Sequence, residues 1–453
     1  MVILSHLFVI ALVAILHTSD AGVSMHNPFY CYSEDPIKPQ IGMFGTKSTY
    51  ETSRGRNIDP NVSTCTPSKF WLLSRHGTRL PSGSDLRRIF EHNERLHREI
   101  LSNYDQGKTS LCASDMELIR PWRFDPNITA DVDQYLVVAG WNELQGLGQR
   151  YQAAFPTLLP STYSRNDYFF RTTDRQRTLA SLRAFADGLF GYNGYEQVQF
   201  EEVPQQDYLL RPYDFCPLYD EVVEEPVEQN AFVEGPEYQE MIAQVSAKLG
   251  FHGSHTLRAV EVETLITICR YEQIWDLNST SPLCGGFSVA NHQVLEYFED
   301  LEYYWKVGFG HRNYRRLFEN LNCNLMQDFL NFIRSNESTD HKARIFSTHS
   351  TILQLILVTL GVFEDEVQLT RHNFAQQTNR LWKSSLVAPM GTNVAVIRYD
   401  CDDGDNDLLF MFNEKPLQIA GCAANGVCKQ SLIMERFSRF LEGNCMEIFC
   451  RNS

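Results

Sequence analysis

A histidine that lies between two arginines is the first feature of this chain that could do chemistry. It occurs in residues 74–81 (S-R-H-G-T-R-L-P), directly after a short apolar run. Arg75 and Arg79 can each form forked hydrogen bonds to phosphate oxygens, and a neutral imidazole is a usable nucleophile near neutral pH. Gly77 lets the backbone pass close to a bound group. The pattern predicts a phosphate site in which His76 attacks phosphorus; the alternative is a basic turn on the surface.

Two further segments carry residues of the same kind. Residues 171–177 (R-T-T-D-R-Q-R) close a predicted strand and open a helix, so their backbone N–H groups could also face an anion. His349 follows another short apolar run and precedes an apolar helix. Taken alone, a basic helix start is usually a solvated face, and a single histidine before an apolar helix is usually a satisfied core residue. Both alternatives stay open at this point.

The predicted secondary structure indicates how these segments could meet. Short apolar runs predict strands, and apolar residues at helical spacing predict helices. The predicted strands are 69–73, 168–171, 344–347, 393–399 and 408–413, and the predicted helices are 85–101, 141–155, 178–189 and 352–360. Strand followed by helix, several times, predicts an α/β core with a mixed, mostly parallel central sheet flanked by helices. All three motifs fall at C-terminal ends of strands, where open α/β sheets bind ligands.

The middle of the chain predicts a second lobe. Residues 204–319 are rich in acidic and aromatic side chains and have a mostly helical pattern. We therefore expect a single domain over residues 23–453, with an α/β core and helical insertions around 82–160 and 204–330.

The composition excludes several classes of partner and site. Lysine and arginine total 40 and aspartate and glutamate total 56, a formal charge of −16, which repels nucleic acid and anionic membranes. A local arginine cluster can still hold phosphate, because nearby charges dominate at short range. The sequence contains no G-x-S-x-G elbow, no Walker loop and no G-x-G-x-x-G. It also lacks C-x-x-C and H-E-x-x-H, so neither a metal nor another cofactor is expected.

Several features predict export from the cell. Residues 7–16 are apolar and small residues follow at Ala21 and Gly22, which is typical of a signal peptide over residues 1–22; the alternative is an N-terminal membrane anchor. The C-terminus carries no K-D-E-L-type retrieval signal, so a secreted, extracellular protein is favoured. N-glycans are expected at the four N-x-S/T sites, Asn61, Asn127, Asn278 and Asn336.

The cysteines agree with an oxidising compartment. There are 12 of them, an even number that predicts a disulfide framework in an exported chain. Cys422 and Cys428, and likewise Cys445 and Cys450, are close enough in sequence to pair. The connectivity cannot be deduced from the sequence.

Residues 74–81 are where the chain resembles the histidine acid phosphatases, branch 2 of the histidine phosphatase superfamily. The resemblance implies a phosphoglycerate mutase-like fold and a histidine that becomes phosphorylated during turnover, at the position of His76. It also implies a third phosphate-binding arginine, which Arg177 matches, and a second histidine that binds the phosphoryl group, which His349 matches. Outer segments resemble the branch of the animal multiple inositol polyphosphate phosphatases: 44–51, 369–393 and 412–417.

One position departs from the family pattern. The inositol polyphosphate branch continues its second histidine as His-Ala-Glu, whereas this chain has His349-Ser350-Thr351. The family's carboxyl group donates a proton to the leaving group, a contribution of roughly two to four orders of magnitude in rate. A threonine hydroxyl is too weak an acid to replace it. We therefore expect either reduced activity or a proton donor from elsewhere, such as a carboxylate on the inserted lobe, a bound water or a substrate phosphate.

The function expected from these features is metal-independent phosphomonoester hydrolysis. Arg75, Arg79, Arg177 and His349 would hold the phosphoryl group while His76 attacks. The resemblance implies a phosphorylated small molecule as substrate, namely inositol polyphosphates including inositol hexakisphosphate, with 2,3-bisphosphoglycerate as a further candidate. The alternative is a pseudophosphatase that binds polyanionic phosphate ligands without turning them over.

Overall fold

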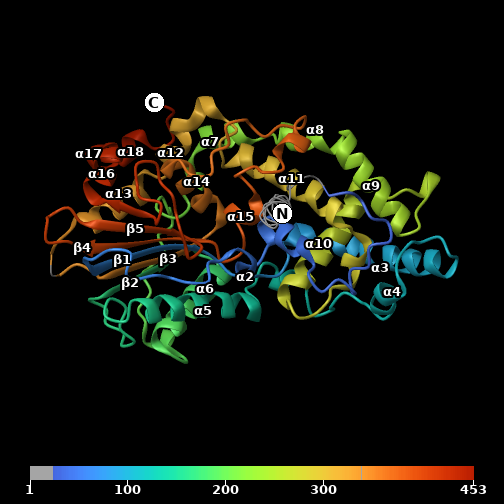
Figure 1. Ribbon diagram of the computed structural model, residues 1–453, viewed down its shortest axis with the longest axis horizontal. Coiled ribbons are helices and arrows are strands. Elements are labelled where there is room, and N and C mark those ends of the chain that lie inside the picture. The colour runs from blue at the N-terminus through green and yellow to red at the C-terminus, as the bar shows by residue number, and fades with distance from the viewer. Residues whose placement is uncertain (1–23, 338) are drawn as a thin grey trace, which may run out of the picture.

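The structure is a computed structural model that describes residues 24–337 and 339–453. A sheet with helices on both faces occupies one side of the molecule and a helical lobe occupies the other (Figure 1). The signal peptide predicted for residues 1–22 lies outside the described residues. Among the helices that the structure describes, none is both long enough and apolar enough to cross a membrane.

The central sheet is mixed. In the described part of the chain it has seven strands in the order β2-β3-β1-β4-β5-β6, with β7 beside β5. The strands β2, β3 and β1 are parallel to one another, and the pairs beyond β1 are antiparallel. The expected mixed α/β sheet flanked by helices is thus confirmed. Its strands are β1 (Thr66–Arg75), β2 (Tyr168–Thr172), β3 (Ala343–Thr348), β4 (Asn393–Asp400), β5 (Asp407–Phe412), β6 (Lys415–Pro416) and β7 (Val427–Lys429).

The three parallel strands end at the same edge of the sheet. Arg75 and Thr348, the last residues of β1 and β3, lie opposite each other in the register. The last residue of β2 lies opposite Ser347, one position earlier on β3. His76 and His349 therefore leave neighbouring strands side by side, at the carboxyl edge where α/β sheets bind ligands.

Helices cover both faces of the sheet. Phe70 and Leu72 of β1 belong to a buried cluster with α5 and α6, whereas Trp71 and Leu73 belong to a second cluster with α13 and α14. Because both faces are buried, β1 is a continuous apolar run rather than an alternating one. The helices on this side of the molecule (Figure 1) are α5 (Val138–Ala154), α6 (Gln176–Phe190), α12 (Arg315–Leu321), α13 (Cys323–Arg334), α14 (Ser350–Leu360), α16 (Gln430–Arg436), α17 (Ser438–Glu442) and α18 (Cys445–Ile448).

The helical lobe begins just after residues 74–81. Ser82 and Asp85 form a capping box at the start of α3, which satisfies orphan N–H groups of the first turn. The lobe comprises α3 (Gly83–Asp105), α4 (Ala113–Ile119), α8 (Val227–Val233), α9 (Pro236–Lys248), α10 (Ala259–Trp275) and α11 (Val289–Lys306). Shorter pieces connect the two sides: η2 (Gly45–Lys47), α2 (Tyr50–Ser53), η5 (Pro212–Phe215), α7 (Pro217–Val223) and α15 (Ser384–Val387).

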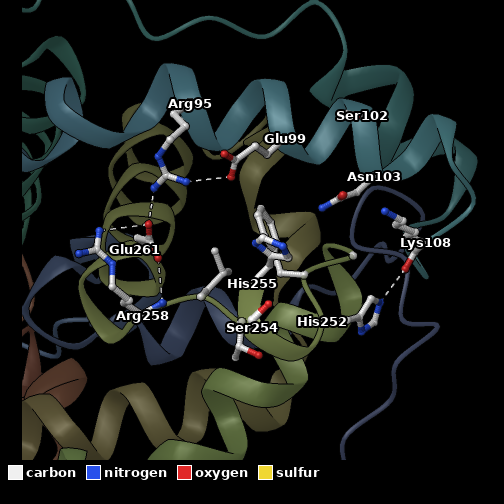
Figure 2. Close-up of a pocket in the computed structure, with 14 residues that line it drawn as sticks. Arg95, Glu99, Ser102, Asn103, Lys108, His252, Ser254, His255, Arg258 and Glu261 are labelled. Carbon is white, nitrogen blue, oxygen red and sulfur yellow. Dashed lines mark hydrogen bonds and ion pairs between the residues drawn. The ribbon is translucent and has the colours of Figure 1, made fainter.

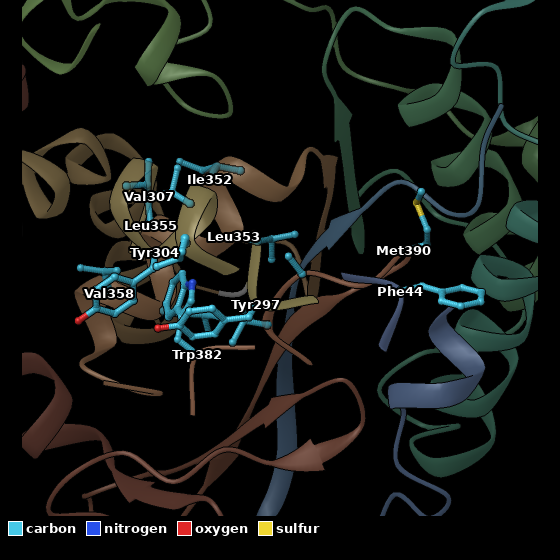
Figure 3. Close-up of a cluster of buried hydrophobic side chains, with 14 of the residues drawn as sticks. Phe44, Tyr297, Tyr304, Val307, Ile352, Leu353, Leu355, Val358, Trp382 and Met390 are labelled. Atoms are coloured by element: carbon cyan, nitrogen blue, oxygen red, sulfur yellow. The ribbon is translucent and has the colours of Figure 1, made fainter. Parts of the chain in front are cut away.

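A buried apolar cluster joins the sheet to the lobe. Ile352, Leu355 and Val358 of α14 lie in one cluster with Tyr304 and Val307 at the end of α11 (Figure 3). The helix that starts after His349 is therefore anchored on both sides of the molecule, and so is the histidine that precedes it.

Six disulfides cross-link the described residues. Cys422 and Cys428, which are close enough in sequence to pair, are bonded to each other. Cys445 and Cys450 are also close in sequence but are not bonded to each other, since Cys445 bonds to Cys323 on α13. The remaining disulfides are Cys31–Cys112, Cys65–Cys401, Cys216–Cys450 and Cys269–Cys284.

Candidate active site

His76 is a buried, neutral imidazole at the end of β1. Its side chain is 3% exposed, and its Nδ1 lies 2.9 Å from the Gly77 carbonyl oxygen. Because a carbonyl oxygen only accepts, Nδ1 donates and Nε2 is left with a free lone pair. Burial lowers the pKa of His76 well below its usual range, and the charges of Arg75, Arg177 and Arg79 lower it further. The side chain is thus held in the form that can act as a nucleophile.

Arg75 precedes His76 at the end of β1 and is held by main-chain carbonyls. Its Nη1 donates to the Thr46 oxygen at 2.8 Å and to the Ala388 oxygen at 2.6 Å. Burial and the charge of Arg79 lower its pKa to about 10. The two carbonyls fix the orientation of the guanidinium group without neutralising its charge.

Arg79 is held by the helical lobe. Its guanidinium group lies over the Tyr271 ring, 5.8 Å from the ring centre, and the Trp275 Nε1–H donates to the Arg79 carbonyl oxygen at 3.2 Å. Both aromatic residues belong to α10. A cation–π contact holds a guanidinium group in place without cancelling its charge.

His349 follows β3, the strand beside β1, and Arg177 lies in the first turn of α6, the helix after β2. The His76 and His349 ring centres are 5.8 Å apart, and Arg177 Nη2 lies 3.4 Å from His349 Nδ1. A guanidinium group only donates, so Nδ1 of His349 accepts and its Nε2–H donates to Thr173 Oγ1, 3.1 Å away. Burial, followed by the charges of Arg177 and Arg211, lowers the pKa of His349 well below its usual range.

The three arginines carry charge that no carboxylate neutralises. Within the described residues neither Arg75, Arg79 nor Arg177 forms a salt bridge, and the Nε of each is buried without a hydrogen-bond partner. Burial and the charges of Arg79 and Arg75 lower the pKa of Arg177 to about 10. Buried charges are normally paired, so this set of side chains is a site for an anion. We call these three arginines with His76 and His349 the cradle.

Glu143 supports the cradle and was not singled out by its sequence context. Its carboxylate accepts from the Thr78 N–H at 2.7 Å, the Thr78 hydroxyl at 2.9 Å and the Tyr50 N–H at 3.1 Å. On the sequence it is only an acidic residue near a helix start. The close backbone contact beside it requires glycine, because a Cβ on Gly77 would lie 2.4 Å from the Gly140 carbonyl oxygen.

Glu299 forms a second support, on the lobe side. It accepts from Lys47 at 2.7 Å, from Arg270 at 3.1 Å and from the Thr46 N–H at 3.2 Å. Burial opposes its ionisation, but these cations prevail and lower its pKa to about 2. Lys47 and Arg270 also line a cavity of about 180 Å³ that reaches Tyr271, the residue on which Arg79 rests.

A larger cavity lies elsewhere. It measures about 550 Å³ and lies between α3 and the segment that leads into α10 (Figure 2). Arg95 there is paired with Glu99 and Glu261, and Arg258 is also paired with Glu261. Both arginines are thus already paired with carboxylates, and no cradle residue lines this cavity.

Thr351 lies in the first turn of α14, two residues after His349, and is half-buried. The first turn of α14 contains no acidic residue, so the start of this helix offers no carboxylate to the cradle.

Comparison with known proteins identifies the family. Residues 69–413 match the family described as the histidine phosphatase superfamily, branch 2. Multiple inositol polyphosphate phosphatase 1 of Drosophila melanogaster is 36% identical, covering 93% of this chain and 90% of that protein. The human protein of the same name is 27% identical over 90% of this chain and 88% of its own length.

Solved structures show the same fold. The phytase of D. castellii superposes with a TM-score of 0.71 at 17% identity, covering 95% of this chain and 94% of that one. The multiple inositol polyphosphate phosphatase of Bifidobacterium longum, in its apo form, gives a TM-score of 0.62 at 13% identity, covering 86% and 96% of the two chains. Its motifs, its fold and its relatives together show that this chain belongs to branch 2 of the histidine phosphatase superfamily.

Proposed function

We propose that this phosphatase hydrolyses inositol polyphosphates, inositol hexakisphosphate included, through a phosphohistidine on His76, with 2,3-bisphosphoglycerate as a further substrate. The names of its relatives support the substrate class. The observation that carries the proposal is the cradle itself: three arginine side chains without counterions surround an imidazole whose Nε2 lone pair is free. That arrangement binds a phosphoryl group and supplies its nucleophile in one place.

The mechanism follows from the cradle. Arg75, Arg79 and Arg177 bind the phosphoryl oxygens and neutralise the charge that they carry in the transition state, and His349 adds to this once it takes up a proton in the presence of the bound anion. His76 Nε2 attacks phosphorus in line with the leaving oxygen and forms a phosphohistidine. Water then attacks phosphorus and releases phosphate, which restores the imidazole. Binding and attack need neither a metal nor another cofactor.

A pair of variants on one helix tests the proposal. Arg177→Ala removes a cradle cation from the start of α6, whereas Arg183→Ala removes an exposed arginine from the same helix that rests on Tyr195. With inositol hexakisphosphate between pH 4 and 8, we expect R177A to lose about 10²–10³ in kcat and R183A to stay near wild type. Alkaline quenching should trap the phosphohistidine. Absence of phosphate release from folded wild-type protein, or equal effects of the two variants, contradicts the proposal.

The second candidate is a pseudophosphatase that retains polyanionic phosphate ligands. The observation in its favour is Thr351, which offers no carboxyl group to the leaving oxygen. Binding of inositol hexakisphosphate without phosphate release, or a phosphohistidine that persists for hours, would favour this function over turnover.

We further propose that the protein is secreted and glycosylated. Six disulfides support an oxidising compartment. The asparagines of all four N-x-S/T sites are exposed: Asn61, Asn127, Asn278 and Asn336. Peptide mass spectrometry of protein recovered from the culture medium, before and after enzymatic deglycosylation, measures both the cleaved N-terminus and the occupied sites.

A further inference from the structure

The leaving group of this phosphatase lacks an obvious proton donor. An alkoxide leaves poorly unless it is protonated, and positioned acid catalysis contributes about two to four orders of magnitude in rate. Thr351 occupies the place of the family's acid and cannot supply the proton. A substitute must reach the cradle from the side of His349, since position 351 lies on that side.

Two carboxylates near the cradle already have other hydrogen-bond or ion-pair partners. Glu143 accepts three hydrogen bonds from Thr78 and Tyr50 and supports the loop that carries His76. Glu299 is ionised, because Lys47 and Arg270 hold its pKa at about 2. A group that stays ionised at every working pH cannot act as an acid.

Asp214 lies on a segment that packs against the His349 side of the cradle. It belongs to η5, and the segment that leads into η5 docks onto the last residue of β3, where the Thr348 hydroxyl donates to the Leu210 carbonyl oxygen at 3.1 Å. The segment is also fixed at its other end, by the disulfide between Cys216 and Cys450. Asp214 is therefore held on a short tether beside the strand end that presents His349.

Two of the charges around Asp214, those of Arg211 and Arg175, also act on His349. Arg211 Nη2 lies 2.6 Å from Asp214 Oδ2, and the charges of Arg211 and Arg175 both lower the pKa of His349. The Asp214 side chain is 33% exposed. Burial raises the pKa of this carboxyl group; Arg211 and Arg175 oppose the shift, while Asp220 and Asp207 add to it. The net effect is to raise the pKa of the Asp214 carboxyl group above its usual value.

We propose that the Asp214 carboxyl group is the proton donor to the leaving alcohol, the role that Thr351 cannot fill. The inference rests on the proposed function. When His76 Nε2 bonds to phosphorus, the bond from phosphorus to the ester oxygen breaks and its electron pair stays on that oxygen. Asp214 transfers its proton to the oxygen and becomes a carboxylate. In the second step the carboxylate takes a proton from the attacking water, the bond from phosphorus to His76 breaks, and phosphate leaves.

The ion pair with Arg211 explains why a polyphosphate is the suitable substrate. An arginine at hydrogen-bond distance favours the ionised carboxylate. Arg211 is 24% exposed, on a long side chain, and a second phosphate group of the substrate competes for its guanidinium group. Once Arg211 binds that phosphate, Asp214 loses its cationic partner and gains an anionic neighbour. Both changes favour the protonated form of the Asp214 carboxyl group. Substrate binding therefore places Asp214 in the form that can donate a proton.

The leaving group provides the decisive test. Inositol hexakisphosphate releases an alkoxide, which needs a proton, whereas p-nitrophenyl phosphate releases a stable phenolate, which does not. We expect Asp214→Asn to lower kcat for inositol hexakisphosphate by about 100-fold or more and to remove the basic limb of its pH profile. The loss with p-nitrophenyl phosphate should be at least about tenfold smaller. Glu221→Gln changes an exposed carboxylate on the adjoining helix α7; it is the matched control and should behave like wild type with both esters.

A second variant separates chemistry from folding. Thr351→Glu returns a carboxyl group to the family position, and in the D214N background it should restore most of the lost turnover of inositol hexakisphosphate. Equal losses with both esters, no loss with either, or no recovery in D214N/T351E overturns the assignment of Asp214. If wild-type protein releases phosphate from neither ester, the proposed function itself fails, and this outcome is distinct from the other three.

Discussion

At the scale of single residues, the cradle combines two features that proteins usually avoid together. It holds a buried imidazole and a half-buried one in their neutral form and surrounds them with guanidinium groups that lack carboxylate partners. Each feature costs stability in the empty protein, because buried cations repel one another and resist desolvation. A bound phosphate relieves both costs at once. Anion binding to the cradle, the stability of the fold and proton uptake by the two histidines should therefore depend on one another.

We predict that an anion binds the cradle more tightly as the pH falls from 7 to 5. The folded pKa of His76 and of His349 lies below the unfolded value of 6.5, so the unfolded chain binds more protons below pH 6.5, and the empty protein loses stability there. A bound anion raises both folded pKa values and removes part of this loss. Sulfate is the suitable probe, because it stays doubly charged throughout this range.

The measurement is the melting temperature with and without sulfate at each pH. A saturating anion at 100 times its Kd adds about 2.7 kcal/mol to the free energy of unfolding. His292 is also buried with a lowered pKa, but it lies outside the cradle. Only the change in melting temperature that sulfate causes therefore reports on the cradle. In His349→Asn this change should depend less on pH. A sulfate effect that weakens toward pH 5 in the wild type would contradict the prediction.

At the scale of elements, the sequence predicts strands and helices well where burial dictates a simple pattern. The predicted strand 69–73 lies inside β1 because both faces of that strand are covered. Contacts between distant segments have no such pattern. Glu143 supports a loop 65 residues away, and Asp214 depends on a hydrogen bond between residues 138 positions apart. Such roles follow from packing and leave no periodic signal.

The crossing of α5 and α6 gives a prediction at this scale. The two helices approach so closely at Gly148 and Gly188 that a Cβ on Gly188 would lie 2.1 Å from the Gln145 carbonyl oxygen. Gly188→Ala should therefore lower the free energy of unfolding by about 1–3 kcal/mol through overpacking, although alanine gains about 1 kcal/mol in helix propensity. Gly42→Ala is the control, because nothing lies within 4 Å of its added methyl group. Urea unfolding measures the transition midpoints of the two variants. Similar midpoints for G188A and G42A would show that α6 shifts to make room for the added methyl group, and would contradict the prediction.

At the scale of the whole molecule, the cradle is complete only when the sheet and the lobe are packed together. The carbonyls that hold Arg75 come from η2 and from the segment after α15, and Arg79 rests on α10 of the lobe. Disulfides fix the segments that complete this arrangement. Cys216–Cys450 fixes the end of the segment that carries Asp214, whereas Cys422–Cys428 closes a short hairpin-like loop beside β7.

These two disulfides should differ in what their removal costs. Cys216–Cys450 closes a loop of 234 residues, which Cys323–Cys445 shortens, and Cys422–Cys428 closes one of 6 residues. Because the stabilisation grows with the logarithm of loop length, C216A/C450A should lose about 4–5 kcal/mol in unfolding free energy and C422A/C428A about 2 kcal/mol. Denaturant unfolding measures both. C216A/C450A should also lose turnover of inositol hexakisphosphate while it remains folded, since Asp214 then loses one of its anchors; equal activity of the two double variants would show that docking onto β3 alone positions the acid.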